Sequence, residues 1–301
     1  MSQKRHGEPL PLGSADLPYS KGVMARALIA AGVPADRAYA LAVRVELDLA
    51  ERAERTVDLD RFRSIANKTL GEDEGERVVG RLRRLADLQR LDVPIIVLIG
   101  GSTGTGKSTV AAEVAHRLGI TRVASTDFIR QTMRAFFSHE FMPTIHYSSF
   151  EAGQAVDADV TGDPTIVGFV EQCRHVCVGV DAAMERALAE GWSMVLEGVH
   201  LVPGVVRAEL PGALVAHVVV EIEEEEVHRI HFHVRDLTTG GIRAMDKYLE
   251  HIDDIRRIQT YVVGRARRHG VPVVENTNVE RTIDQVIEIV MQSAEALRQP
   301  V

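Results

Sequence analysis

The sequence predicts an α/β fold, a parallel β-sheet covered by helices, preceded by a small helical domain. From about residue 93 onward, short β-branched apolar runs alternate with longer segments of helical pattern. This alternation is typical of parallel sheets with right-handed crossovers. A glycine-rich turn joins the first apolar run to the first of these helices, whereas residues 19–91 show helical patterns without strand-like runs. A chain of 301 residues is long enough for both parts.

The N-terminal region is predicted to be helical after a loose leader. Residues 1–18 are rich in glycine, proline and charge, and a helical pattern starts at Tyr19. A second helix begins at Pro34 and places Ala38, Leu41, Ala42, Val45 and Leu49 on one face. Thr56 to about Arg90 predicts at least one more helix. We therefore expect a helical module over residues 19–91.

The glycine-rich turn matches the full P-loop pattern. It reads Gly101-Ser-Thr-Gly-Thr-Gly-Lys-Ser108, between a predicted strand at 93–99 and a predicted helix at 109–118 that ends at Gly119. In this context the loop curls its backbone N–H groups around a triphosphate, Lys107 reaches the β- and γ-phosphates, and Ser108 ligates Mg²⁺. The residues predicted to bind the nucleotide are Gly101, Gly104, Thr105, Gly106, Lys107, Ser108 and Thr109. A glycine turn without a ligand is disfavoured by these flanks, so we expect a P-loop NTPase-type, nucleotide-kinase-like sheet that binds ATP and Mg²⁺.

Four more strands follow at 121–125, 193–196, 214–222 and 271–274. They extend the predicted kinase domain over residues 92–301. A mostly helical insertion over 128–191 contains a less regular, proline-interrupted piece at 142–149. Insertions of this kind either hold an acceptor substrate or form a surface segment without that role, and the sequence pattern of residues 128–191 favours neither strongly.

Charged residues after the second strand are the first candidates for chemistry on the acceptor. Ligands of open parallel sheets bind beyond the carboxyl ends of the strands, and Asp127 and Arg130 lie there. Asp127 can accept the proton of a substrate hydroxyl or help to order Mg²⁺, and Arg130 can hold a substrate anion. Alternatively, Asp127 caps the helix and Arg130 lies on the surface. Arg134 and His146 are further candidates for substrate binding.

The third strand ends at Glu197, followed by Gly-Val-His200. A carboxylate at this place can organise metal-bound water like a Walker B acid, so Glu197 joins Ser108 and Asp127 as a predicted metal residue. His200 is predicted to contact the substrate, with a packing or loop hydrogen-bonding role as the alternative.

The region 228–250 is predicted to be a lid that covers the phosphates. It carries Arg235, Arg243 and Lys247, and Arg235 is expected to act on the transferring group. His231 and His233 resemble a metal pair but lack a third ligand at suitable spacing. Cys173 and Cys177, one helical turn apart, are expected to be buried core residues rather than zinc ligands.

The composition limits the classes of partner. A net charge of −8 lacks the excess of positive charge that generic nucleic-acid binding requires. The sequence shows no signal peptide and no apolar span of membrane length, so we expect a cytoplasmic protein with a small-molecule substrate and no membrane partner. The sequence does not indicate the oligomeric state.

Taken together, the motifs resemble the archaeal-type 2-phosphoglycerate kinase family over nearly the entire chain. The segments that carry the resemblance are Tyr19-Ser-Lys-Gly22, Ile99–Ser108, Thr126-Asp-Phe-Ile-Arg130, Pro143-Thr-Ile-His146, Glu197-Gly-Val-His-Leu-Val-Pro203, Tyr248-Leu and Ile255-Arg-Arg-Ile-Gln259. The resemblance implies ATP-dependent phosphorylation of 2-phospho-D-glycerate at its 3-hydroxyl, giving 2,3-bisphosphoglycerate. It also implies an ATP-cone-like region before the kinase domain. Nucleotide regulation and a structural or oligomerising role both remain open for that region.

Two other functions remain as alternatives. The first is a P-loop kinase of another phosphorylated acid or polyol, or of a nucleic-acid end, although the acidic balance weighs against the last. The second is a non-enzymatic regulatory protein that uses the P-loop as a switch. That second function explains Lys107 but leaves Asp127, Arg130 and the basic lid without a role.

Overall fold

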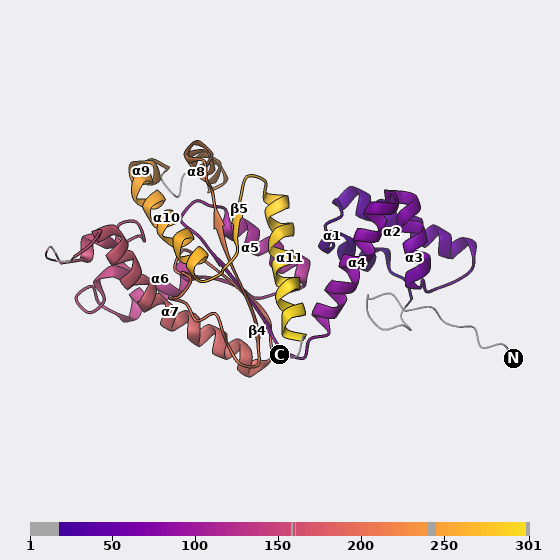
Figure 1. Cartoon of the computed structure of the whole chain (residues 1–301), viewed down its shortest axis with the longest axis horizontal. Helices are drawn as coiled ribbons and strands as arrows, with labels where there is room; N and C mark the ends of the chain where they lie inside the picture. Colours follow the sequence, from indigo (N-terminus) through magenta and orange to yellow (C-terminus); the bar gives the residue numbers. More distant parts are fainter. Residues whose placement is uncertain (1–17, 158, 160, 240–244, 299–301) are drawn as a thin grey trace. The chain divides into compact units, whose positions relative to one another are not determined.

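The computed structural model describes residues 18–157, 159, 161–239 and 245–298, and for residues 234–239, 245 and 298 it describes the backbone only. The described chain divides into two compact units between Asp92 and Val93. Figure 1 shows both units, and each is described by itself below.

Within the described residues, the first unit contains four helices. These are α1 (Lys21–Ala30), α2 (Ala35–Glu51), α3 (Leu59–Leu70) and α4 (Glu72–Gln89). The apolar face of α2 is buried at the five positions that the pattern predicts. The region from Thr56 to Arg90 holds two helices, because Gly71 adopts a φ of 93° that ends α3 before α4 begins.

The second unit is built on a parallel sheet. Its strands are β1 (Ile95–Gly100), β2 (Val123–Ser125), β3 (Met194–Glu197), β4 (Leu214–Glu221) and β5 (Val273–Glu275). They follow the order β2-β3-β1-β4-β5, and every pairing is parallel. The central strand β1 is buried along its whole length. The predicted α/β class with a parallel sheet is confirmed.

Helices cover both faces of this sheet. In Figure 1, α5 (Lys107–Leu118) and α11 (Val279–Arg298) lie on one side, and α7 (Pro164–Glu190) and α10 (Ile252–Arg268) lie on the other. The core between the sheet, α7 and α10 includes Cys173 and Cys177, which are free, buried thiols as predicted. Burial raises the pKa of Cys177 to about 12, so this thiol stays neutral and unreactive.

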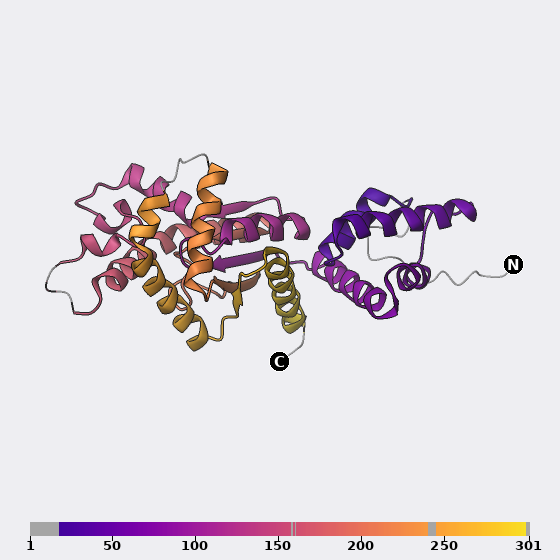
Figure 2. The same ribbon diagram turned by 90° about the horizontal axis from the view of Figure 1, so that it is seen from above.

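The remaining segments gather beyond the carboxyl ends of the strands, as Figure 2 shows. They are α6 (Thr126–Phe136), the 3₁₀ turns η1 (Pro143–His146) and η2 (Ala152–Ala155), α8 (Glu225–Thr239) and α9 (Met245–Glu250). The predicted insertion thus contains α6, η1, η2 and α7, and its proline-interrupted piece contains the short 3₁₀ helix η1 rather than an α-helix.

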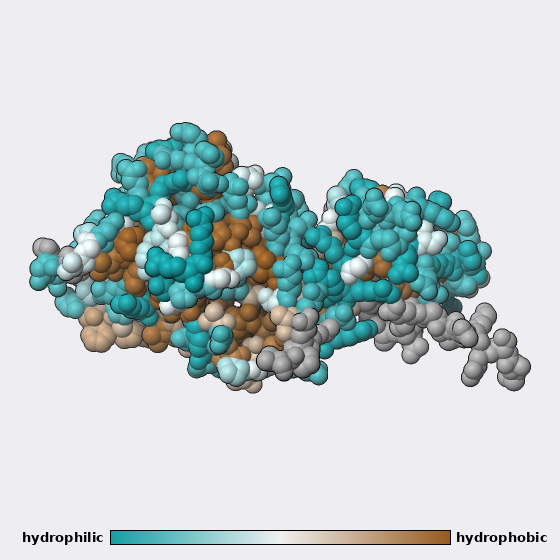
Figure 3. Space-filling model, in the orientation of Figure 1, coloured by the Kyte–Doolittle hydropathy of each residue, from teal (hydrophilic) through white to brown (hydrophobic). Residues whose placement is uncertain are grey.

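Hydrophilic residues dominate the face shown in Figure 3, and hydrophobic areas interrupt them on the second unit. None of the helices in the described part of the chain combines the length and the apolar character needed to cross a bilayer.

Candidate functional site

The P-loop connects β1 to α5 and depends on its glycines. Gly101, Gly104 and Gly106 have φ values of 141°, 87° and 83°. A Cβ atom on Gly101 would lie 2.2 Å from the carbonyl oxygen of Val220, and one on Gly104 would lie 2.4 Å from the ring of Phe232. Glycine is therefore required both for the backbone conformation and for the close packing of the loop against its neighbours.

Side chains of the loop itself and of two later segments bind the carbonyl groups of the loop. The bonds run from Lys107 Nζ to Ser102 O (2.5 Å), from Thr105 Oγ1 to Ser102 O (3.1 Å), from His228 Nε2 to Thr103 O (2.7 Å) and from Asn276 Nδ2 to Thr105 O (2.9 Å). Because the carbonyl groups are occupied in this way, the loop is held in the curled conformation whose N–H groups can receive an anion.

His228 and Asn276 were not predicted from the sequence. Both follow strands of the sheet, His228 in α8 after β4 and Asn276 directly after β5. Their position beyond a strand end was the only signal that could have singled them out. His228 also stacks on Phe232, and Phe232 stacks on Tyr248, with ring centroids 5.2 and 5.1 Å apart. The start of the predicted lid is thus packed against the P-loop.

Ser108 and Glu197 meet at the start of α5. Ser108 Oγ donates to Glu197 Oε1 over 3.0 Å, and Glu197 is only 8% exposed at the end of β3. A hydroxyl and a carboxylate are ligands that suit Mg²⁺, which usually completes its shell with water and phosphate oxygens. Within the described ranges, no group of three or more His, Cys, Asp or Glu side chains could hold a metal. The pair therefore fits a metal that arrives with a nucleotide.

Lys107 lies almost entirely buried beside this pair, with 7% of its surface exposed. Burial lowers the pKa of its ammonium group, while the carboxylates of Glu197 and Asp127 oppose that effect. A phosphate group placed in the loop would favour the charged form of Lys107 in the same way.

Asp127 lies in the first turn of α6 but does not cap it. Ser125 is the N-cap and accepts a hydrogen bond from the backbone N–H of Phe128. The side chain of Asp127 is 61% exposed, and its Oδ1 lies 3.4 Å from Nε of Arg130. The capping alternative is therefore wrong, and the carboxylate is available to a ligand.

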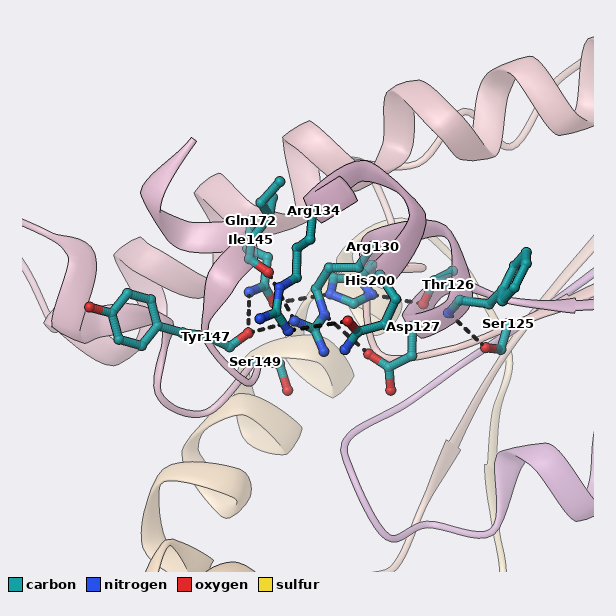
Figure 4. A network of polar contacts seen from close by, with 12 residues as sticks. Ser125, Thr126, Asp127, Arg130, Arg134, Ile145, Tyr147, Ser149, Gln172 and His200 are labelled. Atoms are coloured by element: carbon teal, nitrogen blue, oxygen red, sulfur yellow. Dashed lines mark hydrogen bonds and ion pairs between the residues drawn. The ribbon is translucent and has the colours of Figure 1, made fainter. Parts of the chain in front are cut away.

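Arg130 is buried rather than on the surface. Its Nη1 donates to the carbonyl oxygens of Ile145 and Tyr147, both over 2.9 Å. Figure 4 shows the guanidinium group between Asp127 and the irregular segment 143–149. Arg130 thus holds that segment against α6.

Arg134 and Ser149 border the same region. Arg134 is exposed, and its Nη1 bonds only to Gln131 of its own helix, over 3.1 Å. In Figure 4 its guanidinium group points toward the same region as that of Arg130. Ser149, which the sequence analysis missed, is buried with its Oγ 3.4 Å from Thr103 Oγ1 of the P-loop. The irregular segment therefore meets the P-loop directly.

The predicted contact of His200 with a substrate is corrected by the structure. The side chain of His200 is completely buried, its Nδ1 lies 2.7 Å from Thr126 Oγ1, and its Nε2 lies 3.0 Å from Gln172 Oε1. Both ring nitrogens are therefore occupied by protein atoms. Burial lowers the pKa of His200 to about 4, so the ring is neutral.

The remaining residues predicted for the site either bond to other parts of the protein or have side chains that the structure does not describe. His146 bonds to the carbonyl oxygen of Phe137 over 3.1 Å, and Lys247 pairs with Glu151 over 2.7 Å, so both are engaged within the protein. Arg235 lies in α8, where only the backbone is described, and Arg243 lies outside the described residues. His233 is exposed, whereas His231 is half-buried and burial lowers its pKa.

Comparison with curated proteins finds relatives that match nearly the whole chain, whereas no protein-family model matches it. A protein named 2-phosphoglycerate kinase from Pyrococcus furiosus is 37% identical over 280 residues, which cover 93% of this chain and 91% of the relative. Proteins of the same name from Thermococcus kodakarensis and Methanothermobacter thermautotrophicus are each 38% identical, over 93% and 90% of this chain and 95% and 89% of their own lengths.

Solved structures that align with part of the chain include two kinases. A gluconokinase from Sinorhizobium meliloti aligns with 69% of this chain and 97% of its own, at 16% identity and a TM-score of 0.39. A shikimate kinase from Acinetobacter baumannii, in complex with shikimate, aligns over the same shares at 15% identity and a TM-score of 0.39.

Proposed function

The chain belongs to the 2-phosphoglycerate kinase family, and on this premise we propose that it transfers the γ-phosphoryl group of ATP to the 3-hydroxyl of 2-phospho-D-glycerate. The products are 2,3-bisphosphoglycerate and ADP. The observation that carries this proposal is the match to relatives of that name over about nine tenths of the chain. The reaction is a direct transfer, because kinases of this kind act by positioning and charge neutralisation rather than through a phosphoenzyme.

The P-loop is proposed to hold ATP. The backbone N–H groups of residues 101–109 bind the phosphates, and Lys107 turns from the carbonyl of Ser102 to the β- and γ-phosphates. Ser108 and Glu197 would hold Mg²⁺, and the metal would neutralise charge on the phosphate oxygens. Asp127 is assigned to the acceptor hydroxyl, and its other predicted role, as a metal residue, is the alternative that the Asp127→Asn variant tests.

The acceptor is proposed to lie between α6, the segment 143–149 and the P-loop. Asp127 accepts the proton of the 3-hydroxyl, and its exposed carboxylate supports this role. Arg134 and the Nη2 of Arg130, which makes none of the bonds described above, supply positive charge for the carboxylate and the 2-phosphate. Arg235 is proposed to neutralise the transferring group, with Arg243 and Lys247 covering the phosphates; for Lys247 this requires the pair with Glu151 to open.

The reaction is assigned to the cytoplasm. ATP and phosphoglycerates are multiply charged and do not cross a bilayer unaided, so the enzyme must share a compartment with both. Small phosphorylated molecules are its proposed partners.

The substrate assignment predicts a strong preference among three acids. We expect kcat/KM for 2-phosphoglycerate to exceed that for 3-phosphoglycerate and for glycerate by about 10²-fold or more, because a missing or displaced phosphate leaves the buried guanidinium group of Arg130 without its proposed anionic partner. Of the two phosphoglycerate isomers, only 2-phosphoglycerate also presents a free hydroxyl at carbon 3 to Asp127. Steady-state kinetics with each acid, and phosphorus NMR of the product, measure the preference. Equal use of the isomers would overturn the acceptor and leave the P-loop kinase chemistry in place.

The first unit is predicted to be separable from the chemistry. The site contacts described above involve residues from 100 to 276 only, and the two units divide at Asp92. A protein that starts at Val93 should therefore keep measurable kinase activity, with reduced stability if packing surface is exposed. Circular dichroism would establish that the shortened protein is folded. A folded but wholly inactive protein would mean that the first unit completes the active site.

A further inference from the structure

A chain of buried polar side chains connects three segments behind the proposed acceptor site. Thr126 lies in the first turn of α6, His200 follows β3, and Gln172 lies in the middle of α7. All three are completely buried, as is Thr144 of the segment 143–149. Buried polar groups are costly unless they are paired, and here each of these side chains has a partner.

The hydrogen bonds of the chain have a fixed direction. Gln172 Nε2 donates to the carbonyl oxygens of Thr144 and Tyr147, over 2.5 and 3.1 Å. Its Oε1 therefore accepts from His200, and the hydrogen of His200 must lie on Nε2. The other ring nitrogen, Nδ1, is then free of hydrogen and accepts from the hydroxyl of Thr126 over 2.7 Å. Reversing the Gln172 amide would place its oxygen against two carbonyl oxygens.

The hydrogen-bonded side chains Thr126, His200 and Gln172 hold the same stretch of backbone as Arg130, namely the segment 143–149. The carbonyl oxygen of Tyr147 accepts from both Gln172 and Arg130, and Figure 4 shows the two side chains converging there. At its other end the chain reaches Thr126, the residue before Asp127. The segment that borders the acceptor region is therefore fixed relative to the proposed base by bonds on two sides.

Gly198 independently shows how closely α6 and the end of β3 approach each other. Its φ is 150°, and a Cβ atom there would lie 1.8 Å from Thr126 Oγ1. Only glycine leaves room for the Thr126 hydroxyl to reach His200. The same short turn begins with Glu197, which bonds to Ser108 of the nucleotide side.

We propose that Thr126, His200 and Gln172 form a positioning chain that fixes the acceptor-binding segment 143–149 relative to Asp127 and Glu197. None of the three touches a substrate. Their effect is on how well the acceptor is held and aligned with the phosphoryl group, because misplacement by about 1 Å is enough to slow an aligned transfer strongly. This inference rests on the proposed kinase function of the same site.

Two substitutions and one rescue test the chain. Thr126→Val keeps the shape but leaves Nδ1 of His200 without a donor, and Gln172→Met removes the bonds to Thr144 and Tyr147. Each should lower kcat/KM for the acceptor by about 10- to 100-fold while KM for ATP changes by less than about twofold. Thr126→Ser, which keeps the hydroxyl, should restore most of the acceptor kcat/KM.

Val180→Ala is the matched control, since Val180 is a completely buried residue of the same helix α7 that takes no part in the chain. It should lower the melting temperature and leave both KM values and kcat unchanged. The positioning role is refuted if Thr126→Val and Gln172→Met lower only the melting temperature, or if the KM for ATP rises as much as that for the acceptor. If the wild-type protein uses another acid, the proposed substrate fails, and the same series measured with that acid still tests the chain.

Discussion

Replacing Lys107 by alanine is expected to lower kcat by about 10³-fold, the scale on which enzymes lose rate when one group that stabilises transition-state charge is removed. Negative charge concentrates on the oxygens of the transferring phosphoryl group, and Lys107 is the one predicted cation inside the P-loop itself. The substitution should lower kcat and leave folding intact, because Lys107 stabilises charge that develops on the phosphoryl group only in the transition state.

The structure indicates why the variant should remain folded. Ser102 O, the main acceptor of the Lys107 ammonium group, also accepts from Thr105 Oγ1 over 3.1 Å, so the loop keeps an internal bond. Lys107→Met is a matched variant that retains the buried stem and removes only the charge. Single-turnover rates and melting temperatures of both variants would separate chemistry from stability. Near-wild-type turnover in a folded variant would show that this loop is not catalytic.

Asp127→Asn should lower kcat by about 10²- to 10⁴-fold, the usual range for loss of a general base. The amide keeps the size of the carboxylate but cannot accept the proton of the acceptor hydroxyl. Stability should change little, because Asp127 is 61% exposed and its contact with Arg130 is long, at 3.4 Å. Arg130 itself should stay in place, since Ile145 and Tyr147 hold it.

The measurement for Asp127 must distinguish a base from a metal ligand. We expect the KM for ATP and the Mg²⁺ concentration at half-maximal rate to remain within about twofold of the wild type, because a base contributes mainly to the chemical step. Glu197→Gln provides the contrast, since Glu197 contacts Ser108 and should shift the Mg²⁺ dependence. A collapse of ATP affinity in Asp127→Asn, with turnover retained at saturation, would make Asp127 a nucleotide or metal residue instead.

Local sequence patterns were sufficient for the sheet and the P-loop. The five strands and α5 lie at the predicted places, with boundaries shifted by no more than two residues, and Gly119 ends α5 in the left-handed conformation. Apolar runs and glycine positions report on backbone conformation within a few residues, and they need no knowledge of distant partners. For the same reason the core role of Cys173 and Cys177 could be predicted from one helix alone.

The sequence patterns did not predict hydrogen bonds between side chains and partners that are far apart in the sequence. His200 was expected at the substrate, but Thr126 and Gln172, 74 and 28 residues away, occupy both of its nitrogens. The pair between Lys247 and Glu151 was likewise not anticipated, and the role of Lys247 over the phosphates stays a prediction. His228 and Asn276 were missed because their partners, Thr103 and Thr105, lie 125 and 171 residues away.

The sequence by itself determined the α/β class, the P-loop and the place of Asp127 and Glu197 at strand ends, because each depends on a short, contiguous pattern and on the rule that parallel strands present their carboxyl ends together. Only the tertiary structure decided which side chains are free to meet a ligand. Arg130 is turned partly into the protein by two carbonyl groups, whereas Asp127, three residues earlier on the same helix, is left exposed. The difference arises because hydrogen-bond partners and burial depend on which distant segments the fold brings to the same strand ends. Contacts between distant segments cannot be read from local sequence patterns.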